Sequence, residues 1–149
     1  MFKKIFGFVL DFLFPRKCGV CNKLNDNFVC EDCLKRINVF KIYNFSEEGI
    51  WIYRYEGIVR NLIIDYKFKD KSYLCELFAN CILSDGEVCK IIRKYDIILP
   101  VPLHKKRFKE RGYNQSKLIS DILAQKLGVQ TFDDVLVKIK NTLPQGKNL

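Results

Sequence analysis

Histidine is nearly missing from this sequence, which contains one histidine, one methionine and one tryptophan among 149 residues. No serine or cysteine beside the single histidine, His104, offers an evident nucleophile pairing. Acid–base and nucleophilic catalysis by histidine needs such a partner within hydrogen-bond reach. A histidine-based catalytic site is therefore not expected.

Long hydrophobic runs are also missing. The apolar stretch at residues 5–14 is interrupted by Asp11 and is far shorter than the roughly 20 residues that span a bilayer. No small-residue cleavage site follows it, so it does not read as a secretory signal. Helical spacing over residues 2–14 predicts a short packed helix, with a membrane-surface helix as the alternative. We expect a cytoplasmic protein without stable membrane insertion.

The sequence has neither internal repeats nor low-complexity tracts, and 48% of its residues are hydrophobic, so we expect a folded core. Positive charge dominates: 26 Lys and Arg oppose 17 Asp and Glu, for a formal net charge of +9. Such a balance favours anionic partners, namely nucleic acid, phosphates or a membrane surface. Charge alone does not choose among them.

Four of the seven cysteines form the pattern C-x2-C-x8-C-x2-C. They are Cys18, Cys21, Cys30 and Cys33. Two such pairs supply the four thiolates of a closed tetrahedral zinc shell, which leaves no position for water or substrate. Metal is favoured over two disulfides in a chain without a secretion signal. The sequence therefore predicts a structural Zn²⁺ knuckle, and zinc lowers the net charge of +9 to about +7.

The remaining cysteines, Cys75, Cys81 and Cys89, are an odd number scattered among apolar residues. This pattern predicts free, buried thiols in a reducing compartment.

Hydrophobic periodicity predicts a hairpin followed by alternating helices and strands, the mark of an α/β domain. The expected elements are strands at 37–45 and 50–55, helices at 58–66 and 73–82, a buried parallel strand at 96–99, a basic loop at 103–113, a helix at 115–127 and a strand at 135–139. We expect two domains, residues 1–36 with the knuckle and residues 37–149 with the α/β fold.

The segment 104–115 is the most basic part of the chain, with five Lys and Arg against one acidic residue. It follows the C-terminal end of an expected parallel strand, where open α/β sheets bind ligands. Arg111 and the amides of the next helix start would suit a phosphate, and Phe108 and Tyr113 could stack on bases. A solvated basic loop is the alternative.

Four segments, in order, resemble the ComF family. They are L-F-P-R-K-C-x2-C…C-x2-C at 13–33, Y-R-Y-E-G-I-V-R-x-L-I-x2-Y-K-F at 53–68, D-I-I-L-P-V-P-L-H-K-K-R-F-K-E-R-G-Y-N-Q-S at 96–116 and K-N-T-L-P-Q at 140–145. The resemblance implies an N-terminal four-cysteine zinc knuckle and a type I phosphoribosyltransferase-like domain with a Rossmann-like parallel sheet. It also implies a role in natural competence, the uptake of transforming single-stranded DNA into the cytoplasm.

Carried over to matching positions, the resemblance implies that the four cysteines hold zinc and that the basic segment binds pyrophosphate or nucleic acid. The implied binding residues are Pro100, Pro102, His104, Lys105, Lys106, Arg107, Arg111, Tyr113, Asn114 and Gln115.

One family feature is missing. Type I phosphoribosyltransferases carry two acidic residues and a Thr-Thr-Gly turn that binds phosphoribosyl pyrophosphate (PRPP). Here Asp133 and Asp134 precede Val135, without the threonines or glycine, and are expected to form a polar turn. We expect a ComF protein truncated at its C-terminus or half of a split gene, with a partial sheet whose unpaired edge leaves it marginally stable or dependent on a partner.

These observations predict a ComF-like competence protein that binds single-stranded DNA or a phosphorylated ligand. One alternative is an active phosphoribosyltransferase that uses PRPP with Mg²⁺. Another is a zinc-knuckle interaction module that docks to a competence helicase or another DNA-processing partner.

Overall fold

A computed structural model describes residues 17–142, and the chain divides into two compact units that meet between Ile64 and Asp65. The helix expected at 2–14 lies outside the described residues. A separate domain over residues 1–36 stays a prediction. The two units are described one at a time.

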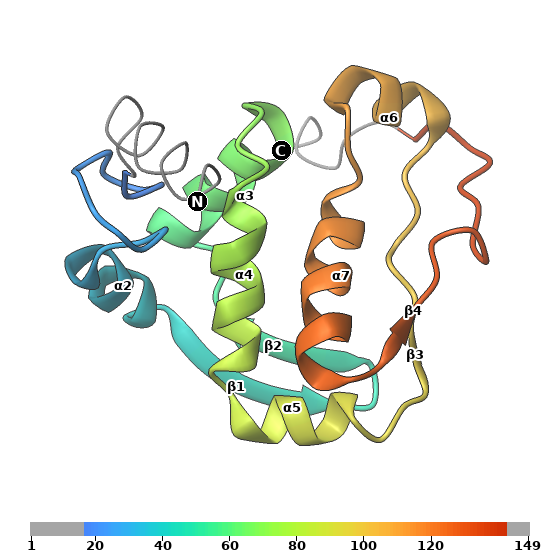
Figure 1. The fold of residues 1–149 in the computed structure, drawn as a ribbon, viewed down its shortest axis with the longest axis horizontal. Helices are drawn as coiled ribbons and strands as arrows, with labels where there is room; N and C mark the ends of the chain where they lie inside the picture. Colours follow the sequence, from blue (N-terminus) through green and yellow to red (C-terminus); the bar gives the residue numbers. More distant parts are fainter. Residues whose placement is uncertain (1–16, 143–149) are drawn as a thin grey trace, which may run out of the picture. The chain divides into compact units, whose positions relative to one another are not determined.

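The first unit contains the four-cysteine segment, a helix and a hairpin. Its elements are α2 (Glu31–Asn38), β1 (Lys41–Ser46), β2 (Gly49–Tyr53) and the start of α3 (Gly57–Phe68), which continues into the second unit (Figure 1). The predicted hairpin is confirmed, with Phe45 opposite Ile50 in an antiparallel ladder. Its first strand begins at Lys41, not at residue 37, because Ile37 is buried as part of α2.

The predicted helix after Gly57 is confirmed as α3. Gly57 has φ +50°, and a Cβ atom there would lie 2.5 Å from the ring of Phe40. Only glycine meets both demands, since it tolerates positive φ and has no side chain to clash. Gly57 therefore fixes the turn that leads from the hairpin into α3.

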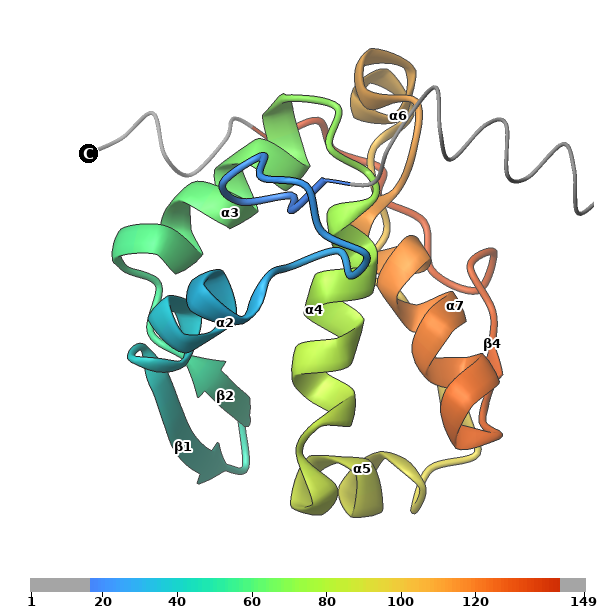
Figure 2. The same cartoon turned by 60° about the vertical axis from the view of Figure 1, so that its left-hand side comes forward.

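The second unit is mostly helical. Its elements after α3 are α4 (Leu74–Leu83), α5 (Gly86–Ile92), β3 (Ile97–Ile98), α6 (Lys105–Arg111), α7 (Gln115–Leu127) and β4 (Gln130–Thr131). Helices α4 and α7 lie side by side in both views (Figures 1 and 2), and they bury Leu74, Leu77 and Leu123 among others. This pairing confirms the apolar faces predicted for the two helices.

Strands β3 and β4 pair in parallel, with Ile97 opposite Gln130 and Ile98 opposite Thr131. Helices α6 and α7 connect them, as parallel pairing requires. The parallel strand expected at 96–99 is thus confirmed, although only Ile97 and Ile98 pair. The described residues form a mixed helix-and-strand fold with a small parallel sheet, which does not establish a Rossmann-like phosphoribosyltransferase fold.

The strand predicted at 135–139 is wrong, because those residues are exposed and outside any strand of the described part. Gly128, at φ +72°, ends α7 in the left-handed conformation and turns the chain back at once. Residues 130–131 therefore reach β3 first, and the apolar run that follows has no strand beside it among the described residues.

The loop predicted at 103–113 is also wrong, since residues 105–111 form α6. His104 caps the start of α6, and Gly112 ends the helix with φ +75°. The lysines, arginines and glutamate between these two residues have a high helix propensity. The sequence analysis also missed α5, whose first turn is capped by Asp85; the Asp85 carboxylate accepts hydrogen bonds from the backbone N–H groups of Glu87 and Val88 at 3.1 Å.

Cys75, Cys81 and Cys89 are not joined in disulfides to other described residues, and the burial predicted for all three is confirmed for Cys89 alone. Cys89 is buried, and Cys75 and Cys81 are half-buried.

Candidate metal centre and nucleic-acid interface

Cys18 and Cys21 are brought together by a tight turn. The N–H of Asn22 donates to the Cys18 carbonyl at 2.9 Å, and the N–H of Cys18 donates to the Lys23 carbonyl at 2.8 Å. Asn22 closes the turn at φ +61°, in the left-handed region that asparagine tolerates better than most residues. The turn thus places both sulfurs on one side of the chain.

Cys30 and Cys33 are positioned by the start of α2. Cys30 is the N-cap residue, with extended backbone, and its carbonyl accepts from the N–H of Leu34 at 2.9 Å. Cys33 lies in the first turn of the same helix. The partial positive charge of a helix N-terminus stabilises thiolates, so this location suits metal ligands.

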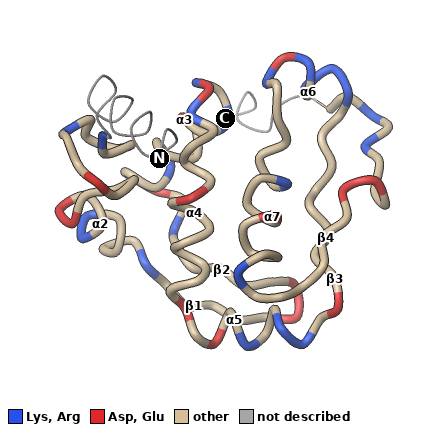
Figure 3. The backbone as a smooth tube through the Cα atoms, viewed as in Figure 1, with Lys and Arg blue, Asp and Glu red and all other residues tan. Residues whose placement is uncertain are grey.

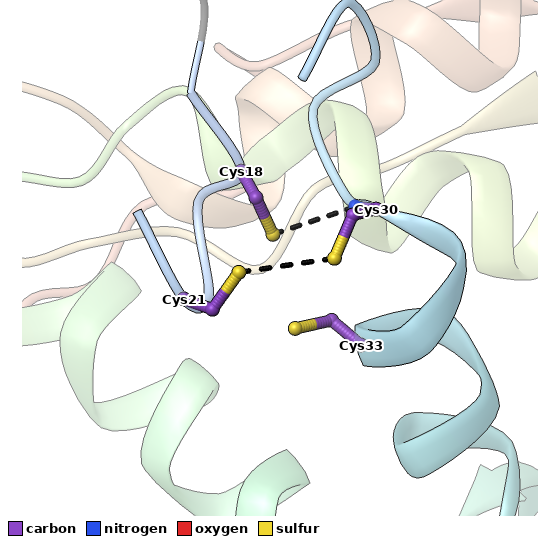
Figure 4. A group of neighbouring side chains, drawn as sticks. All are labelled: Cys18, Cys21, Cys30 and Cys33. Atoms are coloured by element: carbon purple, nitrogen blue, oxygen red, sulfur yellow. Dashed lines mark hydrogen bonds between the residues drawn. The ribbon is translucent and has the colours of Figure 1, made fainter. Parts of the chain in front are cut away.

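The four sulfur atoms converge (Figure 4). All four cysteine sulfurs lie within 4.8 Å of one another, and the Sγ atoms of Cys21 and Cys30 are 3.8 Å apart. A tetrahedral Zn²⁺ with Zn–S bonds of 2.3 Å requires sulfur–sulfur edges of about 3.8 Å. The cysteines are free thiols, and the separations of their sulfur atoms are compatible with a four-thiolate metal site.

The thiols do not ionise alike. Burial of Cys18 opposes ionisation, yet hydrogen bonds from the backbone N–H groups of Cys21 and Cys30 prevail and lower the pKa of Cys18 to about 6. Burial, the neighbouring thiols and the charge on Cys18 raise the pKa of Cys33 to about 12. Repulsion between thiolates thus limits ionisation of the cluster, and a divalent cation removes that repulsion.

The second candidate site is the α6–α7 elbow, defined here as residues 100–115. Pro100 is buried and Pro102 is half-buried, and they lead the chain from β3 to α6. His104 is the N-cap of α6, where its Nδ1 accepts from the backbone N–H of Lys106 at 3.2 Å. The single histidine therefore has a capping role in the fold.

Three residues of the R-G-Y-N-Q motif, namely Tyr113, Asn114 and Gln115, take part in hydrogen bonds that fix the shape of the elbow. The Tyr113 hydroxyl donates to the Tyr66 carbonyl at 2.6 Å, and the Tyr66 hydroxyl donates to the Gln115 carbonyl at 2.9 Å. Asn114 caps α7 by accepting from the N–H of Ser116 at 3.0 Å and donates to the Val101 carbonyl at 3.1 Å. One amide expected to meet a phosphate is therefore already bonded to Asn114.

The cations of the elbow divide into paired and unpaired groups. Arg107 forms an ion pair with Glu110 at 3.0 Å. Lys105, Lys106 and Lys109 are exposed, and none forms an ion pair with another described residue. Figure 3 shows the resulting run of positive charge along α6. The exposed lysines are the part of the elbow that is available to an anionic ligand.

Arg111 lies half-buried at the C-terminal end of α6. Its Nη1 donates to the Gln115 side-chain oxygen at 3.1 Å, and its guanidinium lies 4.8 Å from the ring centroid of Phe68. Burial and the nearby Arg107 lower the pKa of Arg111. The elbow therefore concentrates positive charge beside an aromatic ring that the sequence analysis left without a role.

Lys109 and Phe68 were missed as candidates. Lys109 is four residues after Lys105, so the helix brings the two onto one face, and Phe108, three residues after Lys105, lies at the edge of that face. Phe108 is 49% exposed, whereas Tyr113 is half-buried and hydrogen-bonded. Helix propensity and the cap at His104 were the signals that would have placed Lys109 on this face.

Among residues 17–142, no helix is both long enough and apolar enough to cross a membrane.

Two curated proteins are similar to this chain. Competence protein F of Haemophilus influenzae is 25% identical over 133 residues, which cover 86% of this chain and 56% of that protein. Competence protein ComFC of Bacillus subtilis is 24% identical over 108 residues, covering 71% of this chain and 44% of that protein. The chain spans about half the length of the curated relatives it matches. No family model matches the chain, and no solved structure matches it.

Proposed function

We propose, from the premise that the chain belongs to the ComF family, that it binds single-stranded DNA in natural competence. Both relatives are named competence proteins, which supports a competence-related role. The proposed binding surface is the α6–α7 elbow, and the proposed setting is the cytoplasm, where a competence helicase or another DNA-processing protein would be the partner.

The observation that carries the proposal is the composition of one helical face. Lys105 and Lys109 are exposed on α6 without carboxylate partners among the described residues, and Phe108 is exposed on the same side of the helix, next to Lys105. Single-stranded nucleic acid is bound without sequence preference by such a combination, in which cations contact phosphates and an aromatic ring stacks on a base.

The four cysteines are proposed to bind Zn²⁺ as a structural ion. Four soft sulfur donors suit zinc, and their closed shell leaves no open position for substrate. The ion would hold the turn at Cys18 and the start of α2 together. Its contribution is to the folding of the first unit, and the binding chemistry is assigned to the second unit.

PRPP with Mg²⁺ is the alternative ligand of the same elbow, and transfer of its ribose 5-phosphate is the alternative activity. Single-stranded DNA is preferred because α6 presents three exposed lysines together with the exposed ring of Phe108. Single strands also engage a row of lysines, whereas one pyrophosphate engages only one or two of them.

The test is fluorescence anisotropy of a labelled oligo-deoxythymidine titrated with the zinc-loaded chain. Between about 50 and 200 mM salt, the logarithm of the binding constant falls linearly with the logarithm of the salt concentration. The triple variant Lys105→Gln, Lys106→Gln, Lys109→Gln removes three phosphate contacts. Its salt slope is expected to be smaller by about 2, because each contact contributes roughly 0.7 on a single strand.

A second triple variant controls for net charge. Lys90→Gln, Lys94→Gln, Lys126→Gln removes the same charge from exposed positions elsewhere in the second unit, and its slope is expected to match the wild type. An equal reduction of the salt slope in the two triple variants would contradict the proposal. The absence of salt-dependent binding by the wild type would also contradict it. Displacement of the oligonucleotide by PRPP only in the presence of Mg²⁺ would favour the alternative.

A further inference from the structure

The last turn of α3, residues 66–68, is joined to the α6–α7 elbow. Tyr66 and Tyr113 exchange contacts: each hydroxyl donates to a backbone carbonyl of the other segment, and the two rings lie 6.0 Å apart. Two residues after Tyr66, the ring of Phe68 lies under the guanidinium of Arg111, which is two residues before Tyr113. Phe68 is nevertheless 56% exposed, so much of this side chain is open to solvent.

Lys67 differs from the other lysines of this segment. Lys69 and Lys71 both bind the Asp65 carboxylate, at 2.8 and 2.7 Å. Lys67 is exposed, forms no ion pair with another described residue, and directly precedes Phe68, whose ring contacts the positively charged guanidinium of Arg111. Desolvation, and then that positive charge, lower the pKa of Lys67.

Lys67, next to Phe68 in the sequence, and Arg111, over the Phe68 ring, bring two positive charges to this ring, and the nearby Glu110 carboxylate is already paired with Arg107. Arg111 uses Nη1 for Gln115, and its remaining N–H donors are not bonded to other described residues. An anion between the two cations would relieve their repulsion and accept hydrogen bonds from both. The exposed aromatic ring beside them selects an anion that carries a flat apolar group, as a nucleotide does.

We propose that Lys67 and Phe68 belong to the nucleic-acid-binding surface. Lys67 and Arg111 hold one phosphodiester of a single strand, and the Phe68 ring stacks on the adjacent base. This inference rests on the proposed function and extends its surface from the elbow to the end of α3, a segment outside the basic motif.

The experiment compares Lys67→Gln with Lys69→Gln, two single charge removals two residues apart. Labelled oligo-deoxythymidine is titrated with each zinc-loaded full-length chain at several salt concentrations. Lys67→Gln is expected to lower the salt slope by about 0.7. Lys69→Gln is expected to leave the slope at the wild-type value, because the Lys69 ammonium is held on the Asp65 carboxylate and is not proposed to contact a phosphate.

Phe68→Leu provides a second readout. Loss of base stacking is expected to weaken binding about fivefold or more with an unchanged salt slope, since no charge is removed. Because Phe68 is exposed, the thermal unfolding of the Phe68→Leu variant should match that of the wild type.

Equal slopes for Lys67→Gln and Lys69→Gln would overturn this inference while leaving the proposed function intact. A Phe68→Leu variant that binds as tightly as the wild type would overturn the stacking role. Failure of the wild type to bind the oligonucleotide would overturn the proposed function and this inference together.

Discussion

The four-cysteine cluster and the α6–α7 elbow use their motif residues in opposite ways. In the cluster, all four side chains of the motif converge on one point, and their sulfur atoms lie within 4.8 Å of one another. In the elbow, His104, Tyr113 and Asn114 are bound to the backbone, and the exposed side chains proposed to meet the ligand, three lysines and Phe108, lie at other positions. A specific motif therefore marks ligands in the first case and mainly a turn of the chain in the second.

This difference has a physical reason. A metal shell needs nothing but the donor atoms at the right separation, so spacing in the sequence nearly determines it. A phosphate-binding surface needs cations on a shaped backbone, and polar side chains such as Asn114 are needed to shape it. The residues that remain for the ligand are mainly lysines, which are the least distinctive residues of the segment.

The largest effect is expected for Cys33→Ser. Loss of one thiolate opens the metal shell, and structural zinc sites contribute on the order of 10 kcal/mol to folding. The variant should lose bound zinc, and amide exchange over residues 18–37 should become fast. Metal content measured together with hydrogen exchange checks this.

Cys75→Ser is the matched control, because Cys75 is a free, half-buried thiol outside the cluster. It should keep one zinc per chain. Full zinc content in Cys33→Ser, or unchanged exchange after verified zinc removal, would show that the cluster is not a structural metal site.

A smaller effect is expected for Asn114→Ala. The substitution removes the α7 cap and the bond to Val101, and loss of a cap costs about 1 kcal/mol. Urea unfolding should report a loss of about 1–2 kcal/mol, and the folded variant should bind DNA with an unchanged salt slope.

Asn114→Ser keeps a capping oxygen and should recover roughly half of the loss. A changed salt slope with normal stability would instead place Asn114 in contact with the nucleic acid, and the contrast between the two regions would fail.

The smallest effect is expected at Asp65. Hydrogen bonds from Lys69 and Lys71 lower the pKa of Asp65 below its ordinary value of 3.8. Its stabilising contribution is therefore complete above pH 3.8 and is lost as the pH falls through the lowered value. Asp65→Asn should cost up to about 1 kcal/mol at neutral pH and progressively less in acid.

Urea unfolding of wild type and Asp65→Asn at a series of pH values measures this convergence. A difference that stays constant into acid would mean that the pKa of Asp65 is not lowered. Lys69 would then not be held by Asp65, and it could not serve as the carboxylate-bound control for Lys67.

The sequence predicted most of what depends on local pattern. Apolar spacing located α3, α4 and α7, Gly128 marked the end of α7, and cysteine spacing located the cluster. Pairing of β4 was not predicted, because strand choice depends on which residues reach β3 first after the turn.

The binding surface was harder to predict because its geometry depends on tertiary contacts. Reading residues 105–111 as a loop hid the shared face of Lys105 and Lys109. Phe68 lies 43 positions before Arg111 in the sequence, and their contact follows from the Tyr66–Tyr113 bonds, which no local pattern reveals.

The central claim is that the cysteine cluster is structural and that the elbow binds DNA. Photocrosslinking of an oligo-deoxythymidine to the zinc-loaded chain, with the modified peptides mapped by mass spectrometry, tests both halves at once. We predict crosslinks at residues 104–113, with Phe108 prominent, and few or none at residues 17–38. Crosslinks concentrated at residues 17–38, with none on α6, would contradict the account.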